Sequence, residues 1–405
     1  MKFFDYLHLK EVGVLELLFA LYPILLGYQY GSIPLAILML LIMDALALFK
    51  VGKVSLAKCK PMLYLFVFVF LHQVLWYVLV PELSGSFINN TLYYIIVFIS
   101  FFLIGPALNF DKLNGSINWV ALLVIGGLLY QIPIVLSGGF IQPLKLPFLP
   151  MPESSRLFDE VWRPTSFFWE PQSIVSFLLI PLFISLYESK YAWTVILAIS
   201  MLLSTSTTGI VYVFTIIILT FVLRRKGLGS SWLLVFIVIG LYVALMNSDI
   251  FQLGTEKLLN SDITTDSRTA QGWWVCSTMP SQYWILGAPF EDAYHYYMAG
   301  LANNPNIVTY GESVYMATFW MVIFHFGIVG LFFYLMPYIF MLKRDRLIIP
   351  FMFCLIMALF SNPDFIKGSF VFDMVFAYVF INRNRIKYDN RSHRIRSGQP
   401  NAQLL

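Results

Sequence analysis

Residues 191–223 of the chain, YAWTVILAISMLLSTSTTGIVYVFTIIILTFVL, form a run of 33 residues without a charged side chain. A helix needs about 20 apolar residues to cross the hydrocarbon core of a bilayer, so this run is too long for one ordinary crossing. Glu188 and Lys190 precede it, and the basic triplet 224–226 follows it. If both charged flanks lie on the cytoplasmic side, the chain turns back at the STSTTG segment, residues 204–209. A single tilted helix is the alternative, and it would invert every later loop.

The composition of the whole chain is that of a membrane protein. Of the 405 residues, 59% are hydrophobic and only 12% are charged, and the mean hydropathy is +0.76. Soluble domains are about one quarter charged and less than half apolar. These values exclude an ordinary soluble enzyme, a disordered chain and a coiled coil. The net charge of +4 is small and gives no indication of nucleic-acid binding.

Twelve apolar stretches are long enough, or nearly so, to cross a bilayer. They cover residues 12–28, 32–49, 61–80, 92–110, 118–137, 171–187, 191–205, 208–223, 230–247, 325–342, 347–361 and 368–382. We therefore expect an all-α, polytopic integral membrane protein with one transmembrane domain over residues 1–382. The remaining residues, 383–405, form a basic tail that we expect to be cytoplasmic and mobile.

The Lys and Arg residues favour one orientation of this domain. With the N-terminus inside, 20 of the 26 fall in inner segments and 6 in outer loops, as the positive-inside rule requires. Both termini are then cytoplasmic, and the two large loops, about 138–170 and 248–310, lie outside. We expect the function at the outer face, which in a bacterium would be the periplasm or the cell exterior.

The first large loop ends in the segment RPTSFFWEP, residues 163–171. Pro171 suits the first position of a helix, where its missing N–H is not needed. Glu170 then lies at a helix N-terminus, where the helix dipole favours a negative charge, and Arg163 lies seven residues earlier. The segment therefore places a cation and a carboxylate at the membrane surface. The alternative is a structural ion pair, or two anchors at the lipid interface.

The second large loop carries DSRTAQGWW, residues 266–274. The planar guanidinium of Arg268 suits bidentate binding of a diphosphate, and we expect Gln271 to contact the same substrate. Alternatively, Arg268 pairs with a nearby aspartate and shapes the loop. His295 and Glu312 lie farther along as further candidates, although His295 also fits an ordinary surface histidine. No metal-ligand spacing, phosphate-binding loop or dinucleotide fingerprint is present, so we expect no metal and no cofactor.

Three segments, taken with the dozen spans and the two large loops, carry a family resemblance. They are the segment at 163–171 ahead of a span, the Ser/Thr-Gly hairpin at 203–209, and Arg268 followed nineteen residues later by Gly287. Together they resemble the bacterial O-antigen and exopolysaccharide polymerase family, in the superfamily that includes the O-antigen ligases.

The chain departs from the family pattern in two places. Many relatives have an arginine inside the hairpin, where this chain has Thr207. Many, above all the ligases, have a His-Asn pair before the tenth span, where this chain has Glu312-Ser313.

The resemblance implies a metal-independent glycosyltransferase that acts on lipid-linked sugars. It would move a glycan from undecaprenyl diphosphate to a hydroxyl of the next lipid-linked repeat unit, at the outer face of the membrane. Arg163 and Arg268 would bind the diphosphate and stabilise its charge, and Glu170 would act as general base. Gln271, His295 and Glu312 would be further substrate contacts. Membrane lipid and a chain-length regulator protein are the other expected partners.

Two alternatives stay open. An O-antigen ligase would transfer the finished glycan to lipid A-core, and the departure at 312–313 argues mildly against it. A transporter or flippase of lipid-linked sugars would need charged residues and broken helices near the middle of the membrane. Glu16 is the one candidate for such a residue.

The orientation can be tested with single cysteines and a membrane-impermeant thiol reagent. We expect a cysteine at Ser155 to react in intact cells, because the first large loop lies outside. A cysteine at Ser230 should react only after the membrane is opened. Labelling at 230 but not at 155 would overturn the topology.

Overall fold

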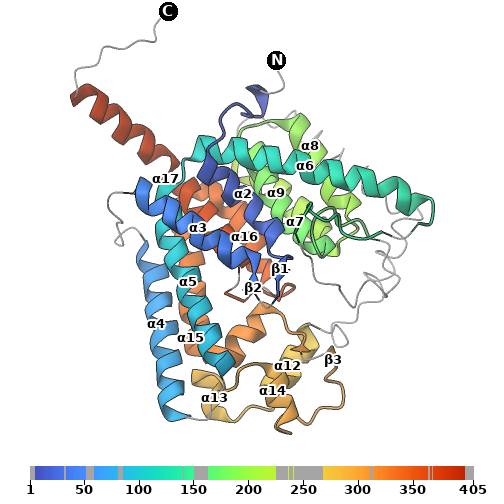
Figure 1. The fold of residues 1–405 in the computed structure, drawn as a ribbon, viewed down its shortest axis with the longest axis vertical. Helices are drawn as coiled ribbons and strands as arrows, with labels where there is room; N and C mark the ends of the chain where they lie inside the picture. The colour runs from blue at the N-terminus through green and yellow to red at the C-terminus, as the bar shows by residue number, and fades with distance from the viewer. Residues whose placement is uncertain are drawn as a thin grey trace, which may run out of the picture.

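The described part of the protein is mainly helical. The structure is a computed structural model that describes residues 5–31, 33–51, 59–80, 85–139, 141–149, 163–224, 236, 240, 268–310, 313–363, 365–366 and 368–396. The helices, shown in Figure 1, are α2 (Val14–Leu25), α3 (Leu35–Lys50), α4 (Lys60–Leu79), α5 (Gly85–Ala107), α6 (Phe110–Leu136), α7 (Pro171–Tyr187), α8 (Tyr191–Leu203), α9 (Thr207–Arg224), α12 (Thr269–Ser277), α13 (Ser281–Leu286), α14 (Ala293–Met298), α15 (Thr318–Arg344), η3 (Arg346–Ile348), α16 (Ile349–Ala358) and α17 (Gly368–Arg396). Two short antiparallel hairpins complete the described part: β1 (Gln29–Tyr30) with β2 (Ile33–Pro34), and β3 (Thr309–Tyr310) with β4 (Ser313–Val314).

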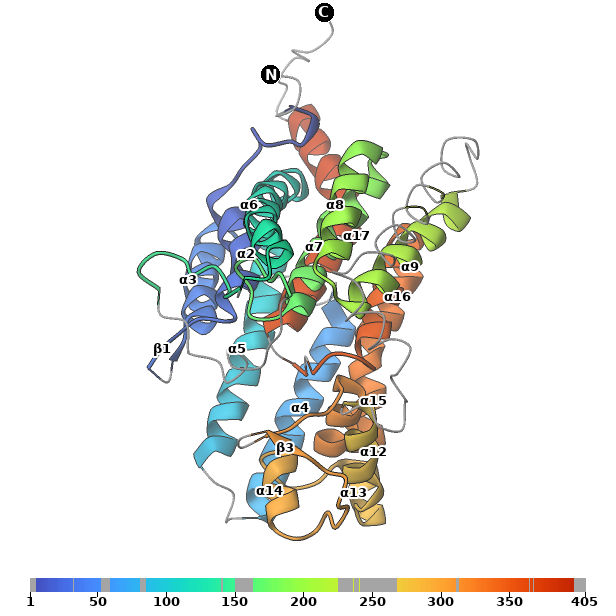
Figure 2. The same ribbon diagram turned by 90° about the vertical axis from the view of Figure 1, so that its right-hand side faces the viewer.

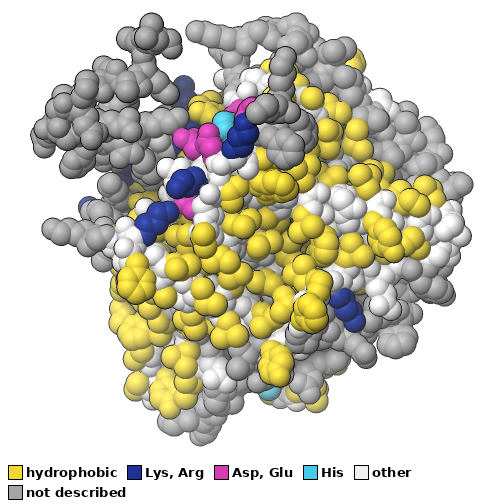
Figure 3. Space-filling model, turned by 45° about the horizontal axis from the view of Figure 1, so that its top comes forward, with side chains coloured by type: hydrophobic (Ala, Val, Ile, Leu, Met, Phe, Trp, Pro, Cys, Tyr) yellow, Lys and Arg dark blue, Asp and Glu magenta, His cyan; other side chains and the backbone are white. Residues whose placement is uncertain are grey.

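The surface of the helical bundle is that of a membrane protein. Within the described residues, α4, α5, α6 and α15 are long and apolar enough to cross a membrane, and shorter apolar helices pack among them. Large hydrophobic side chains are exposed along α3, α4 and α5. Figure 3 shows a broad hydrophobic surface, with most charged side chains gathered in one region near the end that carries the termini. An exposed apolar surface of this extent needs an apolar partner, here lipid.

Helices occupy eleven of the twelve apolar stretches that the sequence defines, and the remaining one, 230–247, lies almost wholly outside the described residues. The main difference is α6, which begins at Phe110 rather than near residue 118. The side chain of Asn109 caps this helix by accepting the N–H of Lys112 at 3.2 Å. The polar first turns are then buried against the N-terminal segment, where Asn118 donates to the carbonyl of Leu7 at 3.0 Å. Buried polar contacts therefore extend the helix beyond its apolar stretch.

The charge-free run at 191–223 forms two helices, as the first alternative for this run predicts. Helix α8 ends at Leu203 and α9 begins at Thr207. Between them, Thr205 adopts a positive φ of +54°, and the hydroxyl of Ser204 donates to the carbonyl of Met201 at 2.7 Å. A Cβ atom at Gly209 would come within 2.9 Å of that same carbonyl oxygen. The tight turn therefore excludes a single tilted helix.

Helices α12, α13 and α14 form a small lobe, residues 268–310, at the opposite end of the molecule from the termini (Figures 1 and 2). The lobe has its own buried cluster, which includes Val275, Cys276 and Tyr296 and packs against Phe324 of α15. The lobe is thus joined to the bundle through the first part of α15.

The lobe and α15 touch through two glycines. Gly287, which follows α13, has φ +84° and ψ 167°, and Gly327 interrupts α15 with φ +66° and ψ −169°. A Cβ atom at Gly287 would lie 2.2 Å from the carbonyl oxygen of His325, and one at Gly327 would lie 2.2 Å from that of Ile285. The kink at Gly327 also separates a short helix from the longer remainder of α15. The apolar residues at about 313–324, ahead of the stretch at 325–342, predict a separate helix there, and in the structure the helix begins at Thr318.

Ion pairs hold together the end of the bundle that carries the termini. Glu16 is 1% exposed, and its Oε1 lies 2.9 Å from Lys50 Nζ and accepts the backbone N–H of Asn109 at 3.0 Å. Arg383 similarly bonds Asp345 at 2.9 Å. These contacts give Glu16 a structural role, which the sequence leaves open. Helix α17 continues to Arg396, well past the end of its apolar stretch.

Replacing Gly327 by Ala should loosen the lobe. The backbone conformation at this position is almost restricted to glycine. Holding another residue in this conformation costs about 1–3 kcal/mol. Overpacking against Ile285 costs about 1–3 kcal/mol more. We expect the purified G327A protein to melt at a clearly lower temperature than the wild type. Gly126→Ala is the matched control, because a Cβ atom there meets nothing within 4 Å; equal melting of the two variants would contradict the proposed contact.

Candidate functional site

Glu170 and Arg268, which the sequence places in two separate large loops, lie side by side in the structure. Glu170 Oε2 is 3.7 Å from Arg268 Nη2, and the two side chains are about one-fifth exposed. Glu170 precedes α7 and Arg268 precedes α12. The site therefore lies where the lobe meets the helical bundle.

The start of α7 explains how Glu170 is presented. Pro171 occupies the first turn of the helix, as the sequence predicts, and Glu170 is the N-cap residue in an extended conformation. Its carboxylate makes no capping hydrogen bond and instead faces Arg268 across the site. An anion at this position is also stabilised by the helix dipole.

Arg268 is held by three elements. Its Nη1 donates to Gln172 Oε1 at 2.6 Å and to the carbonyl of Ser361 at 2.9 Å. Its own carbonyl accepts the N–H of Ala317 at 3.1 Å, and its guanidinium lies 5.6 Å from the ring centroid of Tyr315, within cation–π range. An arginine used in this way has a fixed orientation.

The same cluster has donors that no described residue uses. A guanidinium carries five N–H donors, and the two on Nη1 are engaged, whereas Glu170 at 3.7 Å is beyond hydrogen-bond range of Nη2. The Nε2 group of Gln172 is buried and has no hydrogen-bond partner among the described residues. Donors that converge at a helix N-terminus form a typical site for a phosphate or another anion.

Gln131 of α6 fixes the segment that carries Glu170. This fully buried side chain accepts the backbone N–H groups of Thr165 at 2.9 Å and Ser166 at 2.7 Å, and it donates to the carbonyl of Gln142 at 2.8 Å. Ser166 has a positive φ of +51°, and its hydroxyl donates to the carbonyl of Val124 at 2.8 Å. The segment is therefore bound to α6 by several hydrogen bonds ahead of Glu170.

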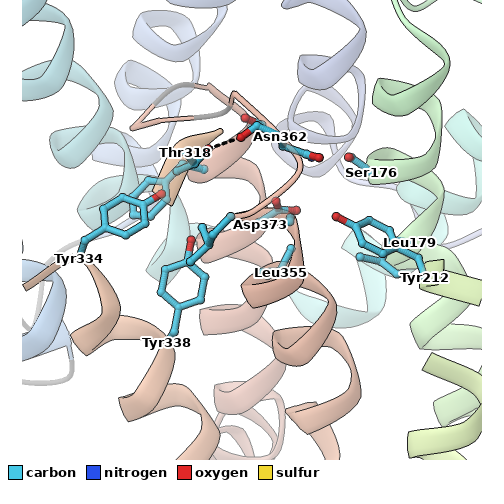
Figure 4. A pocket seen from close by; sticks show the side chains of 13 residues that line it. Ser176, Leu179, Tyr212, Thr318, Tyr334, Tyr338, Leu355, Asn362 and Asp373 are labelled. Atoms are coloured by element: carbon cyan, nitrogen blue, oxygen red, sulfur yellow. Dashed lines mark hydrogen bonds between the residues drawn. The ribbon is translucent and has the colours of Figure 1, made fainter. Parts of the chain in front are cut away.

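A small cavity lies inside the bundle (Figure 4), and Asn362, the residue after Ser361, lines it. In Figure 4 the polar ends of Ser176, Tyr212, Asn362 and Asp373 point towards its centre from four different parts of the chain. Ser176 follows Gln172 by four residues, so the two share one face of α7. The cavity therefore begins about one helical turn along α7 from Gln172.

The loop after α16 links the cavity to the cluster. The carbonyl of Ser361 binds Arg268, and the carbonyl of Asn362 accepts both the N–H of Thr318 at 2.7 Å and its hydroxyl at 2.6 Å. The first N–H groups of a helix lack partners within it, so this loop also completes the start of α15. Any movement of the loop would shift Arg268 and the cavity together.

The remaining predicted site residues occupy different positions. Arg163 is half-buried at the start of the segment that ends at Glu170. Gln271 is 1% exposed, and with its nitrogen facing the carbonyl of Tyr315 it donates there at 3.1 Å, so it supports the loop around Tyr315. His295 is half-exposed in the lobe, where its Nδ1 lies 2.9 Å from Asp292. Glu312 lies outside the described residues.

The described residues include no group of three His, Cys, Asp or Glu side chains placed to hold a metal ion. Cys276, the cysteine of the lobe, is completely buried, and its burial raises the pKa of the thiol above the ordinary value. Since the thiolate is the reactive form, Cys276 is a packing residue and not a nucleophile.

Sequence reasoning did not find Gln131, Gln172 or the cavity around Asp373. Gln131 and Asp373 each interrupt an apolar stretch, which is a usable signal because polar groups are costly inside a membrane. Gln172 carried no comparable signal, because its importance comes from Arg268, which is distant in the sequence.

A scan of the chain against protein-family models found no match, and a search among curated proteins likewise found none.

Gln131→Leu should release the segment before Glu170. The change removes the acceptor of two buried N–H groups, and each buried group left without a partner costs about 1–3 kcal/mol. We expect faster amide hydrogen exchange in peptides that cover 163–170, and a lower melting temperature. Tyr130→Phe, at an exposed neighbouring position on α6, is the control. Unchanged protection in Q131L would show that Gln131 does not hold the segment.

Proposed function

We propose that the protein is a polysaccharide polymerase that extends O-antigen, capsule or exopolysaccharide chains on a polyprenyl diphosphate. The observation that carries this proposal is the cluster of Glu170, Gln172 and Arg268 at the junction of the lobe and an apolar helical bundle. The sequence resemblance, which the segment at 163–171 and Arg268 help to carry, points to the same chemistry. The apolar bundle supports a membrane location in which a lipid-linked substrate reaches the site from the bilayer.

The donor-rich side of the cluster suits the diphosphate. Arg268 has N–H groups beyond those used by Gln172 and Ser361, and Gln172 Nε2 adds a buried donor. Such donors stabilise the negative charge that develops on a leaving diphosphate, and they do so without a metal ion. Arg163, at the start of the segment that carries Glu170, is the second arginine that we assign to the diphosphate.

Glu170 supplies the base. The acceptor hydroxyl oxygen attacks the anomeric carbon of the donor glycan, and a new glycosidic C–O bond forms. The bond between that carbon and the diphosphate oxygen breaks, and the diphosphate keeps the electron pair and stays on the polyprenyl chain. The hydroxyl proton moves to the carboxylate of Glu170 and later to solvent. General-base catalysis of this kind contributes about 10²–10⁴-fold in rate.

The proposal includes twelve spans with cytoplasmic termini and a site at the outer face of a bacterial inner membrane. The positive-inside distribution of Lys and Arg supports this orientation. The cluster lies at the junction of the lobe and the bundle, on other elements than the ion pairs of Glu16 and Arg383. Lipid-linked repeat units, membrane lipid and a chain-length regulator remain the proposed partners.

A flippase is less well supported, because Glu16, the residue that favours it, is engaged by Lys50 and by the backbone of Asn109. An O-antigen ligase would use the same donor chemistry with a different acceptor. The identity of the acceptor therefore separates polymerase from ligase, and a reaction with lipid-linked repeat units alone distinguishes them.

Glu170→Gln should abolish most polymer formation. The change keeps the size of the side chain but removes its basicity, so the rate should fall about 10²–10⁴-fold. As a partly exposed ion pair, Glu170 would contribute only about 0–1 kcal/mol to stability. The rate is measured with lipid-linked repeat units purified from the producing cells, at matched concentrations of folded protein. Glu11→Gln, at an exposed position, is the control, and E170Q activity within about threefold of the wild type, far less than a lost base would cost, would remove Glu170 from the chemistry.

Arg163→Lys separates diphosphate binding from anchoring. Lysine keeps the charge but loses the planar fork, so we expect normal protein levels and no long-chain polymer in cells that carry this variant as their only copy. Arg346→Lys, an exposed arginine near η3, should leave the chain-length distribution unchanged. A wild-type distribution in R163K would identify Arg163 as an interfacial anchor.

A further inference from the structure

We propose that four aromatic side chains beside Arg268 form the docking surface for the isoprenoid chain of the lipid-linked substrate. These side chains, which we call the aromatic ladder, are Trp273 of α12, Trp320 and Phe319 of α15, and Phe360 in the turn after α16. The inference rests on the proposed function, because it takes the diphosphate to lie at Arg268. It assigns a binding role to aromatic residues that otherwise only pack the lobe against the bundle.

The four rings of the ladder contact one another in sequence. The ring centroids of Trp273 and Trp320 lie 5.7 Å apart, and those of Trp320 and Phe319 lie 5.0 Å apart. Phe319 in turn stacks on Phe360 at 4.9 Å. These separations are typical of interacting aromatic pairs. The rings therefore form one continuous aromatic surface across α12, α15 and the end of α16, which follow one another along one side of the molecule in Figure 2.

The ladder is open on its outer side. Trp273 is 51% exposed and Phe360 is 50% exposed, and the two rings between them are partly exposed. The segments that carry the rings, 269–277, 313–324 and 356–363, contain no charged side chain. An exposed aromatic surface without charges needs an apolar partner.

The ladder is also rigidly built. A Cβ atom at Gly272 would overlap the indole of Trp320, so the glycine allows α12 to pack directly on that ring. The backbone N–H of Phe319 donates to the carbonyl of Leu359 at 2.8 Å, which joins the start of α15 to the turn after α16. A surface that is already ordered loses little conformational freedom when a ligand binds.

The ladder begins next to the proposed diphosphate site. The hydroxyl of Thr269 donates to the carbonyl of Phe360 at 3.4 Å, and Nη1 of Arg268 donates to the next carbonyl, that of Ser361, at 2.9 Å. Trp273 lies four residues after Thr269, on the same face of α12. A chain that is bonded to a diphosphate at Arg268 is therefore held at a high local concentration beside the ladder.

Other occupants fit this surface less well. Sugar hydroxyls need acceptors as well as donors, and the side chains of Trp and Phe offer only the indole N–H. An acyl chain of the bilayer has the same apolar chemistry as an isoprenoid chain, but nothing bonds it to Arg268. A second copy of the protein is the remaining candidate. The experiment therefore measures whether occupancy of the ladder depends on the diphosphate.

The experiment is photo-crosslinking of the purified full-length protein in lipid nanodiscs that contain undecaprenyl diphosphate. Phe360→p-benzoylphenylalanine and Trp273→p-benzoylphenylalanine place the photoreactive group at the two half-exposed positions. The control is the same replacement at Phe332, an exposed residue farther along α15. We expect adducts with undecaprenyl diphosphate at 360 and 273 to exceed those at 332 at least about 10-fold, because the bound diphosphate holds its own chain nearby. Excess inorganic diphosphate, or Arg268→Lys, should reduce them to the level at 332.

An affinity measurement tests the same surface without a crosslinker. Phe360→Ala should weaken the binding of undecaprenyl diphosphate about 3–10-fold, because part of one aromatic contact with the chain is lost. The binding of inorganic diphosphate, which has no chain, should stay unchanged. Phe332→Ala should alter neither affinity.

The outcomes separate this inference from the proposed function. Adducts at 360 that persist in excess inorganic diphosphate and in the R268K background would mean that lipid covers the ladder without using Arg268, and would overturn the inference. A crosslinked dimer of the chain would overturn it in favour of a contact between copies. If undecaprenyl diphosphate binds through Arg268 but gives no excess of adducts at 273 and 360, the ladder is wrong and the diphosphate site stands. If R268K binds undecaprenyl diphosphate as the wild type does, the diphosphate site fails, and the ladder fails with it.

Discussion

The contact between Gly287 and Gly327 determines how the rest of the molecule is assembled. Each residue has a backbone conformation almost restricted to glycine, and each lies where a Cβ atom would overlap the backbone of the other segment. This contact seats the lobe on α15, and Arg268 begins the first helix of that lobe. The position of Arg268 beside Glu170 therefore depends on a backbone contact that involves neither side chain.

The candidate site combines a rigid frame with polar groups that have capacity left for a ligand. Gln131 holds the segment of Glu170 through backbone hydrogen bonds, and the loop after α16 holds Arg268 and the start of α15. Among the described residues, the Nε2 group of Gln172 is buried without a hydrogen-bond partner, and Nη2 of Arg268 lies beyond hydrogen-bond range of Glu170. These donors lie together at the start of α7, where an anion can use them.

Much of the architecture follows from local patterns in the sequence. The lengths of the apolar stretches predicted most of the helices. The charged residues on both sides of 191–223 predicted that the chain turns back within this run, and the structure has the turn at Thr205. Pro171 predicted the start of α7. The beginning of α6 at Phe110 was missed, because it depends on a cap by Asn109 and on burial against the N-terminal segment. The cap is a local signal, but the burial that makes the polar first turns helical comes from a segment far away in the sequence.

The candidate site was only partly predictable for the same reason. The family resemblance implied a site formed by arginines and a carboxylate from two loops, and in the structure Glu170 of one loop lies beside Arg268 of the other. Gln172, Ser361 and Asn362 take part through contacts with residues far away in the sequence, which leave no spacing pattern. Asp373 was visible as an aspartate in an apolar stretch, but its importance comes from the cavity that five separate helices enclose.

The central claim is that the diphosphate of a lipid-linked sugar binds between the lobe and the start of α7. A cryo-electron microscopy structure of the protein in nanodiscs, with the lipid-linked repeat unit bound, tests it most directly. The account predicts diphosphate density within hydrogen-bond distance of Arg268 and Gln172. Density for the diphosphate elsewhere, with Arg268 still bonded only to Gln172 and Ser361, would contradict the account.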